Sequence, residues 1–234
     1  MYVPAHFSMT RDQLHEALAE IRSADLVTAH ESGPVATHLP FVHVPAAAAD
    51  PEGFGSLITH VTRTNSQWSE PHLGQALVIL HVNEHYVSPT WRPSSVDPDG
   101  AVPTLNYVTV HVYGDLVIHH DTAWLADAVR QVTDRFEVDR PSPWRVEDMT
   151  AERVERMLRA AVGIELKITR VEGKAKLSQN VSPADLAGIV AGLRADGDEE
   201  SAAWLEDVSV PHALARAELL AHVGATWRSR ASNT

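Results

Sequence analysis

The feature that most constrains the fold of this chain is a series of short apolar stretches with the two-residue period of β-strands. Val108, Val110 and Val112 alternate with polar or aromatic neighbours, which is the pattern of a strand with one buried face. A continuous apolar run over residues 76–82 is short enough to be a buried strand. Hairpin-like neighbours and few helical crossovers favour an antiparallel barrel over a doubly wound parallel sheet.

The remaining elements follow from turn signals, capping residues and helical spacing of apolar residues. Further strands are expected at residues 25–30, 35–44, 55–62, 116–119 and 164–169. Turns are expected at Glu31–Pro34 and at Gly114–Asp115, with a polar loop at residues 93–100. Helices are expected at residues 10–23, from Asp121, from Thr150 to a stop at Gly163, from Ser182 to about residue 194, and after the acidic break at residues 196–200.

Composition narrows the classes of function. The chain has 234 residues, and its hydrophobic fraction of 44% can form a real core. The net charge of -12 argues against direct nucleic-acid binding, because the phosphate backbone attracts basic proteins. No pair of short helices with a basic second member indicates a helix-turn-helix. The absence of cysteine excludes thiolate nucleophiles and thiolate metal ligands, so a metal would need histidine and carboxylate.

The location of the protein is expected to be the cytoplasm. The first residues lack the charged and apolar segments of a signal peptide. No apolar stretch is long enough to span a bilayer, so we expect no contact with a membrane.

Polar and aromatic residues gather where three apolar strands give way to turns, between residues 55 and 107. His60, in the first of these runs, is followed by Arg63, Asn65 and Trp68. The imidazole of His60 fits a haem axial ligand or a hydrogen-bonding group to a flavin, or else a core histidine bonded to a backbone carbonyl. Arg63 could hold a phosphate, a haem propionate or a substrate carboxylate through its planar fork, or form a surface salt bridge.

The other runs offer hydroxyls, a flat ring and amides. Tyr86 and Ser88 lie at a strand end, and Trp91 could stack on a ring cofactor, although a turn with a packed aromatic also explains this segment. Asn106, between two apolar neighbours, either bonds backbone across strands or contacts a ligand. Near Lys176, the polar stretch that includes Ser178 and Gln179 could bind an anion or satisfy a turn.

Other site classes have weak signals. His81 and His85, and likewise His119–Asp121, have ligand-like spacing but do not lie on one helical face, so a structural metal is not favoured at either place. The chain has no glycine-rich phosphate loop, no Ser-His-Asp order and no paired-carboxylate pattern.

Six motifs, in order along the chain, together resemble the PaiB family, whose members are usually named FMN-binding negative transcriptional regulators. They are Met1–Phe7, Thr37–Pro40, His60–Trp68, Tyr86–Trp91, Val102–Tyr107 and Gly173–Asn180. The resemblance extends from the first residue to about Arg194.

The resemblance implies an α+β fold with an antiparallel split β-barrel of the FMN-binding type and flanking helices. It also implies a homodimer with cofactor pockets at its interface. We expect the split-barrel domain at residues 1–180 and a C-terminal helical extension at residues 181–234. The cofactor would be haem b or FMN, because the family outline also includes the haem-dependent piperazate synthases, which form an N–N bond. We therefore expect a cofactor-dependent protein that acts as an enzyme on a small metabolite. The alternatives are a transcriptional regulator and a structural or partner-binding module whose pocket stays empty.

The residues singled out above are expected to have the following roles, of which the resemblance implies that of His60. His60 would be the ligand of a haem iron, and Tyr86 and Ser88 would be catalytic. The expected cofactor contacts are His60, Arg63, Asn65, Trp68, Trp91, Asn106, Lys176, Ser178 and Gln179.

The chain departs from the family pattern at positions where a pocket is expected. Arg92 stands where a tyrosine is common and Leu105 where a tryptophan is common, while Asn83-Glu84 replaces a Gly-Pro pair. Thr59, Ser66 and Ala175 are further departures. The loss of flat side chains and the gain of Glu84 and Arg92 predict a cavity with a different shape and charge.

Overall fold

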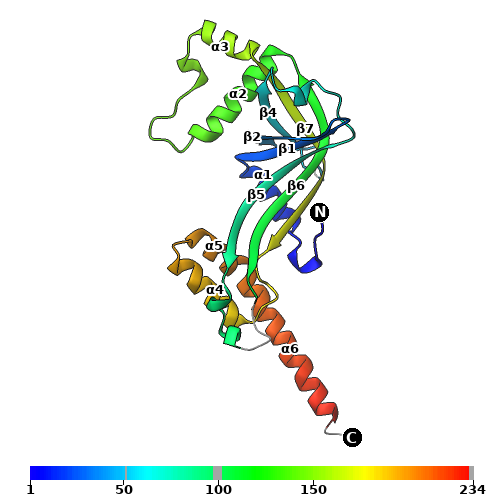
Figure 1. Cartoon of the computed structure of the whole chain (residues 1–234), viewed down its shortest axis with the longest axis vertical. Coiled ribbons are helices and arrows are strands. Elements are labelled where there is room, and N and C mark those ends of the chain that lie inside the picture. The colour runs from blue at the N-terminus through cyan, green and yellow to red at the C-terminus, as the bar shows by residue number, and fades with distance from the viewer. Residues whose placement is uncertain (51, 97–101, 232–234) are drawn as a thin grey trace. The chain divides into compact units, whose positions relative to one another are not determined.

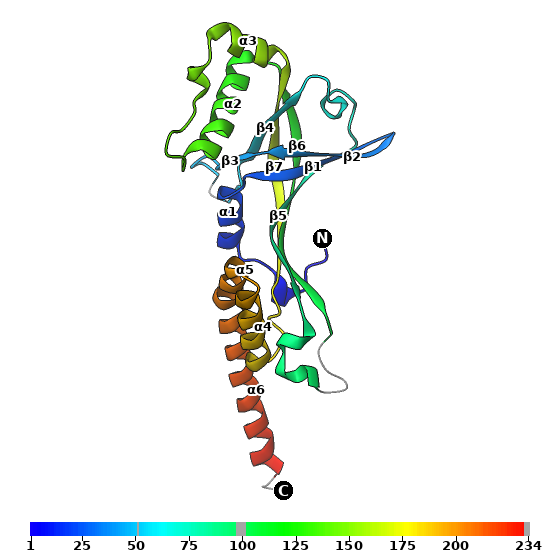
Figure 2. The ribbon, with the colours of Figure 1, turned by 60° about the vertical axis from the view of Figure 1, so that its left-hand side comes forward.

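The computed structural model describes residues 1–50, 52–96 and 102–231, and its elements are shown in Figures 1 and 2. The strands are β1 (Ser23–His30), β2 (Gly33–Pro40), β3 (Val42–Val44), β4 (Ser56–Thr62), β5 (Ala76–Val87), β6 (Thr104–His119) and β7 (Ala161–Lys176). The helices are α1 (Arg11–Ala19), α2 (Thr122–Glu137), α3 (Ala151–Arg159), α4 (Pro183–Ala195), α5 (Glu199–Trp204) and α6 (Val210–Ala231), with a π-helical turn at Leu205–Ser209.

The described strands form one seven-stranded sheet in the order β2-β1-β5-β6-β7-β4-β3. The pairs β1–β2, β1–β5, β3–β4 and β4–β7 are antiparallel. The first hairpin has His30 opposite Gly33, which confirms the turn predicted after residue 30. The antiparallel α+β architecture is therefore confirmed.

The chain divides into two compact units, and β5, β6 and β7 contribute residues to both. The first unit consists of Met1, Met9–His81 and Thr109–Gly173, and the second consists of Tyr2–Ser8, Val82–Val108 and Lys174–Thr234. The division of the chain at residue 180 into a barrel and a helical extension stays a prediction.

Helix positions agree with the capping residues. The Thr10 side chain accepts a hydrogen bond from the Gln13 N–H and Gln13 returns one, which is the predicted capping box. The side chains of Asp121, Thr150 and Ser182 each accept a backbone N–H at the start of α2, α3 and α4. In the second unit, α4 and α5 pack together beside the π-helical turn (Figure 2).

The predicted alternation of buried and more exposed side chains along a strand is present in the core of the first unit. Val110 and Val112 are fully buried while Thr109, His111 and Tyr113 between and beside them are half-buried. Helices α2 and α3 join this unit through an apolar cluster that buries Leu125, Val129, Val146, Leu158 and Ala161. Each square ångström of apolar surface removed from water stabilises the fold by about 25 cal/mol.

Two glycines predicted to end elements lie inside strands instead. Gly114 belongs to the continuous strand β6, where a Cβ would come within 2.3 Å of the Lys167 carbonyl oxygen. Gly163 lies in β7, where a Cβ would come within 2.3 Å of the Trp124 ring. Both predictions were wrong because these glycines allow close packing within the sheet and under a helix, and neither forms a turn.

The predicted loop at residues 93–100 is described only in part. Pro93–Val96 form a 3-10 turn, and residues 97–100 lie outside the described part of the chain.

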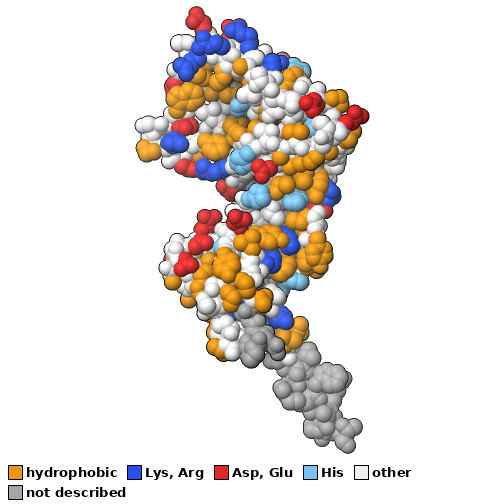
Figure 3. Space-filling model, viewed as in Figure 1, with side chains coloured by type: hydrophobic (Ala, Val, Ile, Leu, Met, Phe, Trp, Pro, Cys, Tyr) orange, Lys and Arg blue, Asp and Glu red, His pale blue; other side chains and the backbone are white. Residues whose placement is uncertain are grey.

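Surface charge on the described helices is uneven despite the negative total. Figure 3 shows basic side chains gathered over α3, whose last turn carries Arg156 and Arg159. Within the described residues, no helix is both long enough and apolar enough to cross a membrane.

Candidate cofactor-binding site

The residues expected at the site are distributed between the two units. The first unit contains His60, Arg63, Asn65 and Trp68, and the second contains Tyr86, Ser88, Trp91, Asn106, Lys176, Ser178 and Gln179. Each set is therefore described within its own unit.

The second unit contains a cavity of about 290 Å³ at the start of β6 and the end of β7. It is lined by His6, Phe7, Arg92, Val102, Thr104, Asn106, Lys176, Ser178, Asn180 and Val181. Three of the expected residues, Asn106, Lys176 and Ser178, thus share one cavity.

Two cations face this cavity and none of its lining residues is acidic. The Lys176 ammonium donates to the Thr104 hydroxyl at 2.6 Å and to the Leu105 carbonyl at 2.5 Å. Burial lowers the pKa of Lys176, and the nearby Lys174 and Arg92 lower it further. The Arg92 Nε is buried and has no hydrogen-bond partner among the described residues. Asp185 interacts with Arg92 electrostatically, but it does not line the cavity, so the lining itself carries positive charge that suits an anionic ligand.

A chain of buried polar groups supports the cavity wall. The Ser178 hydroxyl donates to Asn106 Oδ1 at 3.0 Å, and the Asn106 amide nitrogen lies 3.2 Å from His85 Nε2. His85 Nδ1 lies 3.3 Å from Asn83 Oδ1, and Asn83 Nδ2 donates to the Ser201 hydroxyl at 3.1 Å.

These contacts define the protonation state of His85. Because Asn106 Oδ1 accepts from Ser178, its amide N–H must donate to His85 Nε2, and the proton of His85 then lies on Nδ1 and is donated to Asn83. The ring is therefore neutral, in agreement with burial, which lowers the pKa of His85. The chain holds the Ser178 hydroxyl in one orientation at the edge of the cavity.

The backbone at Ser178 is unusual for its residue type. Ser178 is buried and has a φ of 63°, in the left-handed region, and non-glycine residues there store strain that neighbouring contacts must offset. The next side chain supplies such contacts, because Gln179 donates to the Ala175 carbonyl at 2.6 Å and accepts from the Leu177 N–H at 2.8 Å. Gln179 therefore stabilises the turn and does not line the cavity.

The remaining expected residues of the second unit lie outside the cavity lining. Tyr86 is 57% exposed, and the Ser88 hydroxyl accepts the Thr90 N–H at the start of a 3-10 turn. The Trp91 ring packs against α4, where a Cβ on Gly192 would come within 2.3 Å of it. The Trp91 ring, which was expected to stack on a cofactor, is thus packed against a helix of the protein itself.

In the first unit, three of the four expected residues have local structural partners. Arg63 donates to the carbonyls of Arg159 and Ala161 at 3.0 and 2.9 Å, where α3 ends. The Asn65 side chain accepts the Gln67 N–H at 2.9 Å, and the Trp68 indole donates to the Arg63 carbonyl at 3.1 Å.

His60 differs from these neighbours. It pairs with Gly163 across β4 and β7, and a Cβ on Gly163 would meet Trp124 of α2, so His60 lies on the sheet face that α2 covers. Its Nδ1 is buried with no hydrogen-bond partner among the described residues. Burial lowers the pKa of His60 and keeps the ring neutral. A neutral imidazole can ligate a metal through a ring nitrogen that makes no hydrogen bond, and a metal would have to reach His60 on the face that α2 covers.

Three side chains in or beside the cavity carry only weak signals in the sequence. The charge of Arg92 is a departure from the family pattern. His85 has ligand-like spacing to His81, and His6 stands out only as part of a motif. Within the described residues, no group of three or more His, Asp or Glu side chains is placed to hold a metal ion.

Several buried and half-buried histidines make stability depend on pH. Burial lowers the folded-state pKa of His43, His60, His85 and His111 below the ordinary value of 6.5. The unfolded chain therefore binds protons more readily, so the free energy of unfolding should fall as the pH decreases through 6.5.

Chemical denaturation at pH 6.5 and about one unit on either side of it, at pH 7.5 and 5.5, would measure this dependence around the ordinary histidine pKa. The measurement compares the wild type with His85→Gln, whose amide does not titrate. The variant should have a shallower loss of stability at low pH. Equal pH dependence in both proteins would contradict the assigned neutral state of His85.

Comparison with known families supports a cofactor site. A model of the family described as "Putative FMN-binding domain" matches residues 1–170. The chain is 25% identical over 203 residues to Protease synthase and sporulation protein PAI 2 of Bacillus subtilis, covering 83% of this chain and 89% of that protein.

Two solved structures share the fold. The FAD and Heme binding protein from Mycobacterium smegmatis matches with a TM-score of 0.50 and 20% identity over 71% of each chain. The Flavocytochrome Anf3 from Azotobacter vinelandii matches with a TM-score of 0.52 and 14% identity over 74% of this chain and 72% of that one. At these identities the likeness concerns the fold alone, and the expected split-barrel type of antiparallel sheet is confirmed.

Proposed function

The chain belongs to the FMN-binding-domain family, of the PaiB type expected from its motifs, and we propose that it binds FMN with the phosphate in the cavity of the second unit. The observation that carries this proposal is the cavity's charge, two cations and no carboxylate in its lining. A phosphate there would gain charge-assisted hydrogen bonds, which are about twice as strong as neutral ones.

Each polar group of the cavity has a definite part in this proposal. Arg92 Nε lacks a partner, and an unpaired buried donor costs about 1–3 kcal/mol until an acceptor reaches it. Lys176 supplies a second charge from the end of β7. The Ser178 hydroxyl donates to Asn106 and so presents its lone pairs elsewhere, which makes Ser178 an acceptor for a ligand hydroxyl.

The expected role as an enzyme is part of the proposal. FMN, when bound, supplies hydride and electron transfer, and the substrate would be a small metabolite. Tyr86, exposed near the end of β5, and Ser88, which follows that strand, would be the catalytic residues that contact the substrate. A homodimer would complete the pocket by covering such exposed groups, as the family resemblance implies.

The direct test is the spectrum of the freshly purified full-length protein, followed by mass spectrometry of the extracted chromophore. The proposal predicts flavin absorption bands and a released mass equal to that of FMN. If the protein is colourless, titration with FMN followed by quenching of flavin fluorescence should reach one flavin per chain. A protein that leaves FMN fluorescence unchanged would refute the proposal.

A second candidate, haem bound through His60, is favoured by one observation in the first unit. His60 offers a buried, neutral imidazole whose Nδ1 has no partner among the described residues, which fits the donor that haem iron takes. Bound haem would supply Lewis-acid or redox chemistry.

Replacing His60 with alanine tests the haem candidate. If haem binds there, the Soret band of the haem-reconstituted protein should shift or disappear in His60→Ala. His111→Ala is the matched control, because His111 also has a buried Nδ1 without a partner among the described residues. A Soret band that His60→Ala leaves unchanged would remove His60 as the ligand.

Two more specific roles of the family, transcriptional regulation and piperazate synthesis, have less support. A transcriptional regulator would need to approach DNA with a net charge of -12, against electrostatic repulsion. Relation to the piperazate synthases depends on haem, so the His60 experiment decides whether that role is worth an assay.

A further inference from the structure

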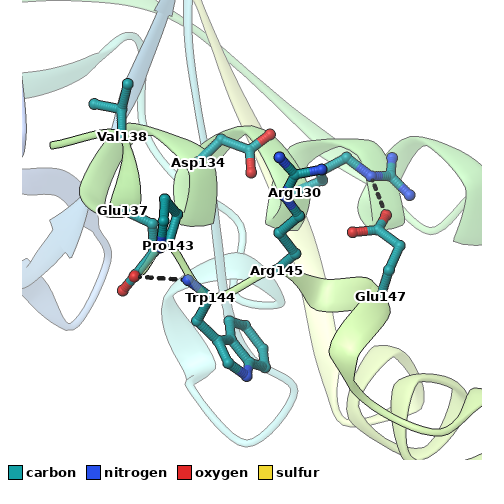
Figure 4. Close-up of a pocket in the computed structure, with 8 residues that line it drawn as sticks. All are labelled: Arg130, Asp134, Glu137, Val138, Pro143, Trp144, Arg145 and Glu147. Atoms are coloured by element: carbon teal, nitrogen blue, oxygen red, sulfur yellow. Dashed lines mark hydrogen bonds and ion pairs between the residues drawn. The ribbon is translucent and has the colours of Figure 1, made fainter. Parts of the chain in front are cut away.

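A cavity of the first unit and the cavity of the second unit differ in how their charges are balanced. The first, of about 500 Å³, lies between α2 and the segment that follows it (Figure 4). Its arginines have acidic neighbours in the same lining, because Arg130 Nε donates to Glu147 Oε1 at 2.7 Å and Arg130 also interacts with Asp134. Arg145 interacts with Glu147 as well. These charges explain one another, so this cavity indicates no charged ligand.

The Lys176 amine in the cavity of the second unit has no carboxylate neighbour of this kind. Its Nζ donates to the Thr104 hydroxyl at 2.6 Å and to the Leu105 carbonyl at 2.5 Å. It lies 5.8 Å from the centre of the Tyr107 ring. Within the described residues, no carboxylate lies within 4.0 Å of this nitrogen. Lys176 is therefore held in place by neutral groups and not by an ion pair.

The two hydrogen bonds of Lys176 leave one position on its nitrogen. An ammonium nitrogen carries three protons, whereas a neutral amine carries two protons and one lone pair. Two protons are donated to Thr104 and Leu105, and no hydrogen-bond acceptor among the described residues takes the third. The amine can therefore lose that proton while it keeps both hydrogen bonds, and its lone pair then occupies the remaining position.

The electrostatic environment makes this proton easier to lose. Burial lowers the pKa of Lys176, and Lys174 and Arg92 lower it further, while Tyr107 acts in the opposite direction. A lower pKa increases the neutral, nucleophilic fraction of the amine at a given pH. Lysines that form imines are activated in this way, by removal from water and by a neighbouring cation.

Arg92 provides a place for an anion in the same cavity. Its Nε is buried and has no hydrogen-bond partner among the described residues, and Asp185, which interacts with Arg92, does not line the cavity. We propose that Lys176 forms an imine with a small carbonyl compound whose phosphate or carboxylate group is held at Arg92. The cavity volume of about 290 Å³ suits a compound of a few carbon atoms.

The reaction needs no further reagent. The neutral amine adds to the carbonyl carbon to form a C–N bond, and the carbinolamine then loses its hydroxyl group as water to form the C=N bond. The proton that the ammonium group releases first is regained when the imine is protonated, so one ammonium and one carbonyl give one protonated imine and one water. Nothing is oxidised or reduced. The protonated imine keeps the positive charge of Lys176 in the cavity that Arg92 also lines.

The simpler explanation is that Lys176 only joins the end of β7 to the start of β6. It accounts for both hydrogen bonds of the amine. It does not account for a second cation with an unpaired buried donor in the same lining, or for the absence of a carboxylate from that lining. The proposal goes beyond flavin binding and does not depend on it, because the same cations can hold either anion.

The chain itself supplies the controls for the main experiment, because it has three lysines, Lys167, Lys174 and Lys176. The full-length protein is incubated with glycolaldehyde phosphate, the imines are reduced to stable amines with sodium cyanoborohydride, and the label on each lysine is measured by peptide mass spectrometry. The proposal predicts that Lys176 is labelled at least about tenfold faster than Lys167 or Lys174, since a bound carbonyl group has a high effective concentration. Glyoxylate carries a carboxylate in place of the phosphate, and the faster of the two reagents identifies the acidic group.

Replacing Arg92 with glutamine tests the place of the anion. In the wild type, glycolaldehyde, which lacks the phosphate, should label Lys176 more slowly than glycolaldehyde phosphate does. Arg92→Gln should remove this advantage of the phosphate, while the reaction with glycolaldehyde itself continues. Arg194→Gln is the matched control and should keep the advantage, because Arg194 is an exposed arginine of α4 outside the cavity lining. Circular dichroism of both variants shows whether each is folded.

Two results would overturn the proposal. One is equal labelling of the three lysines of the wild-type protein by both acidic reagents, a comparison that requires no variant. The other is an unchanged advantage of the phosphate in folded Arg92→Gln.

Labelling in the presence of FMN separates this proposal from the flavin proposal. Rapid labelling of Lys176 that saturating FMN does not slow would contradict the flavin site alone. FMN binding together with equal labelling of the three lysines would contradict the imine alone.

Discussion

Replacing Asn106 with leucine should lower the free energy of unfolding by about 3 kcal/mol, since it leaves two buried polar groups unpaired at roughly 1–3 kcal/mol each. The Asn106 side chain is fully buried and bonds to Ser178 on one side and His85 on the other. Leucine has the same branched shape and number of side-chain heavy atoms as asparagine, so a cavity would not add to the loss. Urea denaturation followed by circular dichroism measures the change.

Asn180→Leu is the matched control for this prediction. Asn180 lines the same cavity and carries the same amide, but it is exposed, so the free energy of unfolding should change by less than about 0.5 kcal/mol. Equal stability of Asn106→Leu and wild type would show that the chain of polar groups does not support the cavity wall.

Replacing Lys176 with methionine should weaken FMN binding by about 10- to 100-fold, the value of a hydrogen bond to a charged group. Methionine keeps the length and apolar stem of the lysine while removing its charge. Lys176 bonds to Thr104 and Leu105 at the cavity, so the expected loss has two causes, lost attraction of the phosphate and a looser end of β7. Fluorescence titration with FMN measures the affinity.

Lys167→Met distinguishes a local effect from a general effect of charge. Lys167 is an exposed lysine on the same strand, β7, and does not line the cavity. The control should bind FMN as the wild type does. Similar losses in both variants would mean that the total charge of the protein, and not the cavity, determines affinity.

The elements that the sequence predicts well are those determined by local patterns. The alternation around Val110 and the caps at Thr10 and Asp121 depend on neighbouring residues alone, and the structure confirms them. The turn predicted at Gly114 was wrong, because the glycine is needed for the close approach of Lys167, a residue of another strand. A glycine that allows backbones to approach and a glycine that turns the chain look the same in sequence.

The candidate site was predictable to a similar degree. Lys176, Ser178 and Asn106 were expected near a cofactor, and the structure brings them to one cavity. Gln179 and Asn65 are polar for a different reason, because their side chains satisfy nearby backbone groups. Sequence cannot separate these cases, since amides that bind a ligand and amides that cap a turn occur in the same segments.

The role of His85 depends on strand pairing, which brings it to Asn106 from another strand. The spacing of His81 and His85 is ligand-like but does not favour a metal, and in the structure the His85 ring is a neutral member of a hydrogen-bonded chain. In the same way, Trp91 packs against α4 at Gly188 and Gly192, which lie about 100 residues further along the chain. Such partners become visible only once the sheet and helices are assembled.

The central claim is that the cavity of the second unit recognises the phosphate of a flavin. Riboflavin is identical to FMN except for that group, so comparison of the two affinities in the wild-type protein is the most direct measurement. We predict that riboflavin binds about tenfold or more weakly than FMN, and that inorganic phosphate displaces FMN but not riboflavin. Equal affinity for FMN and riboflavin, with no effect of phosphate, would contradict the claim.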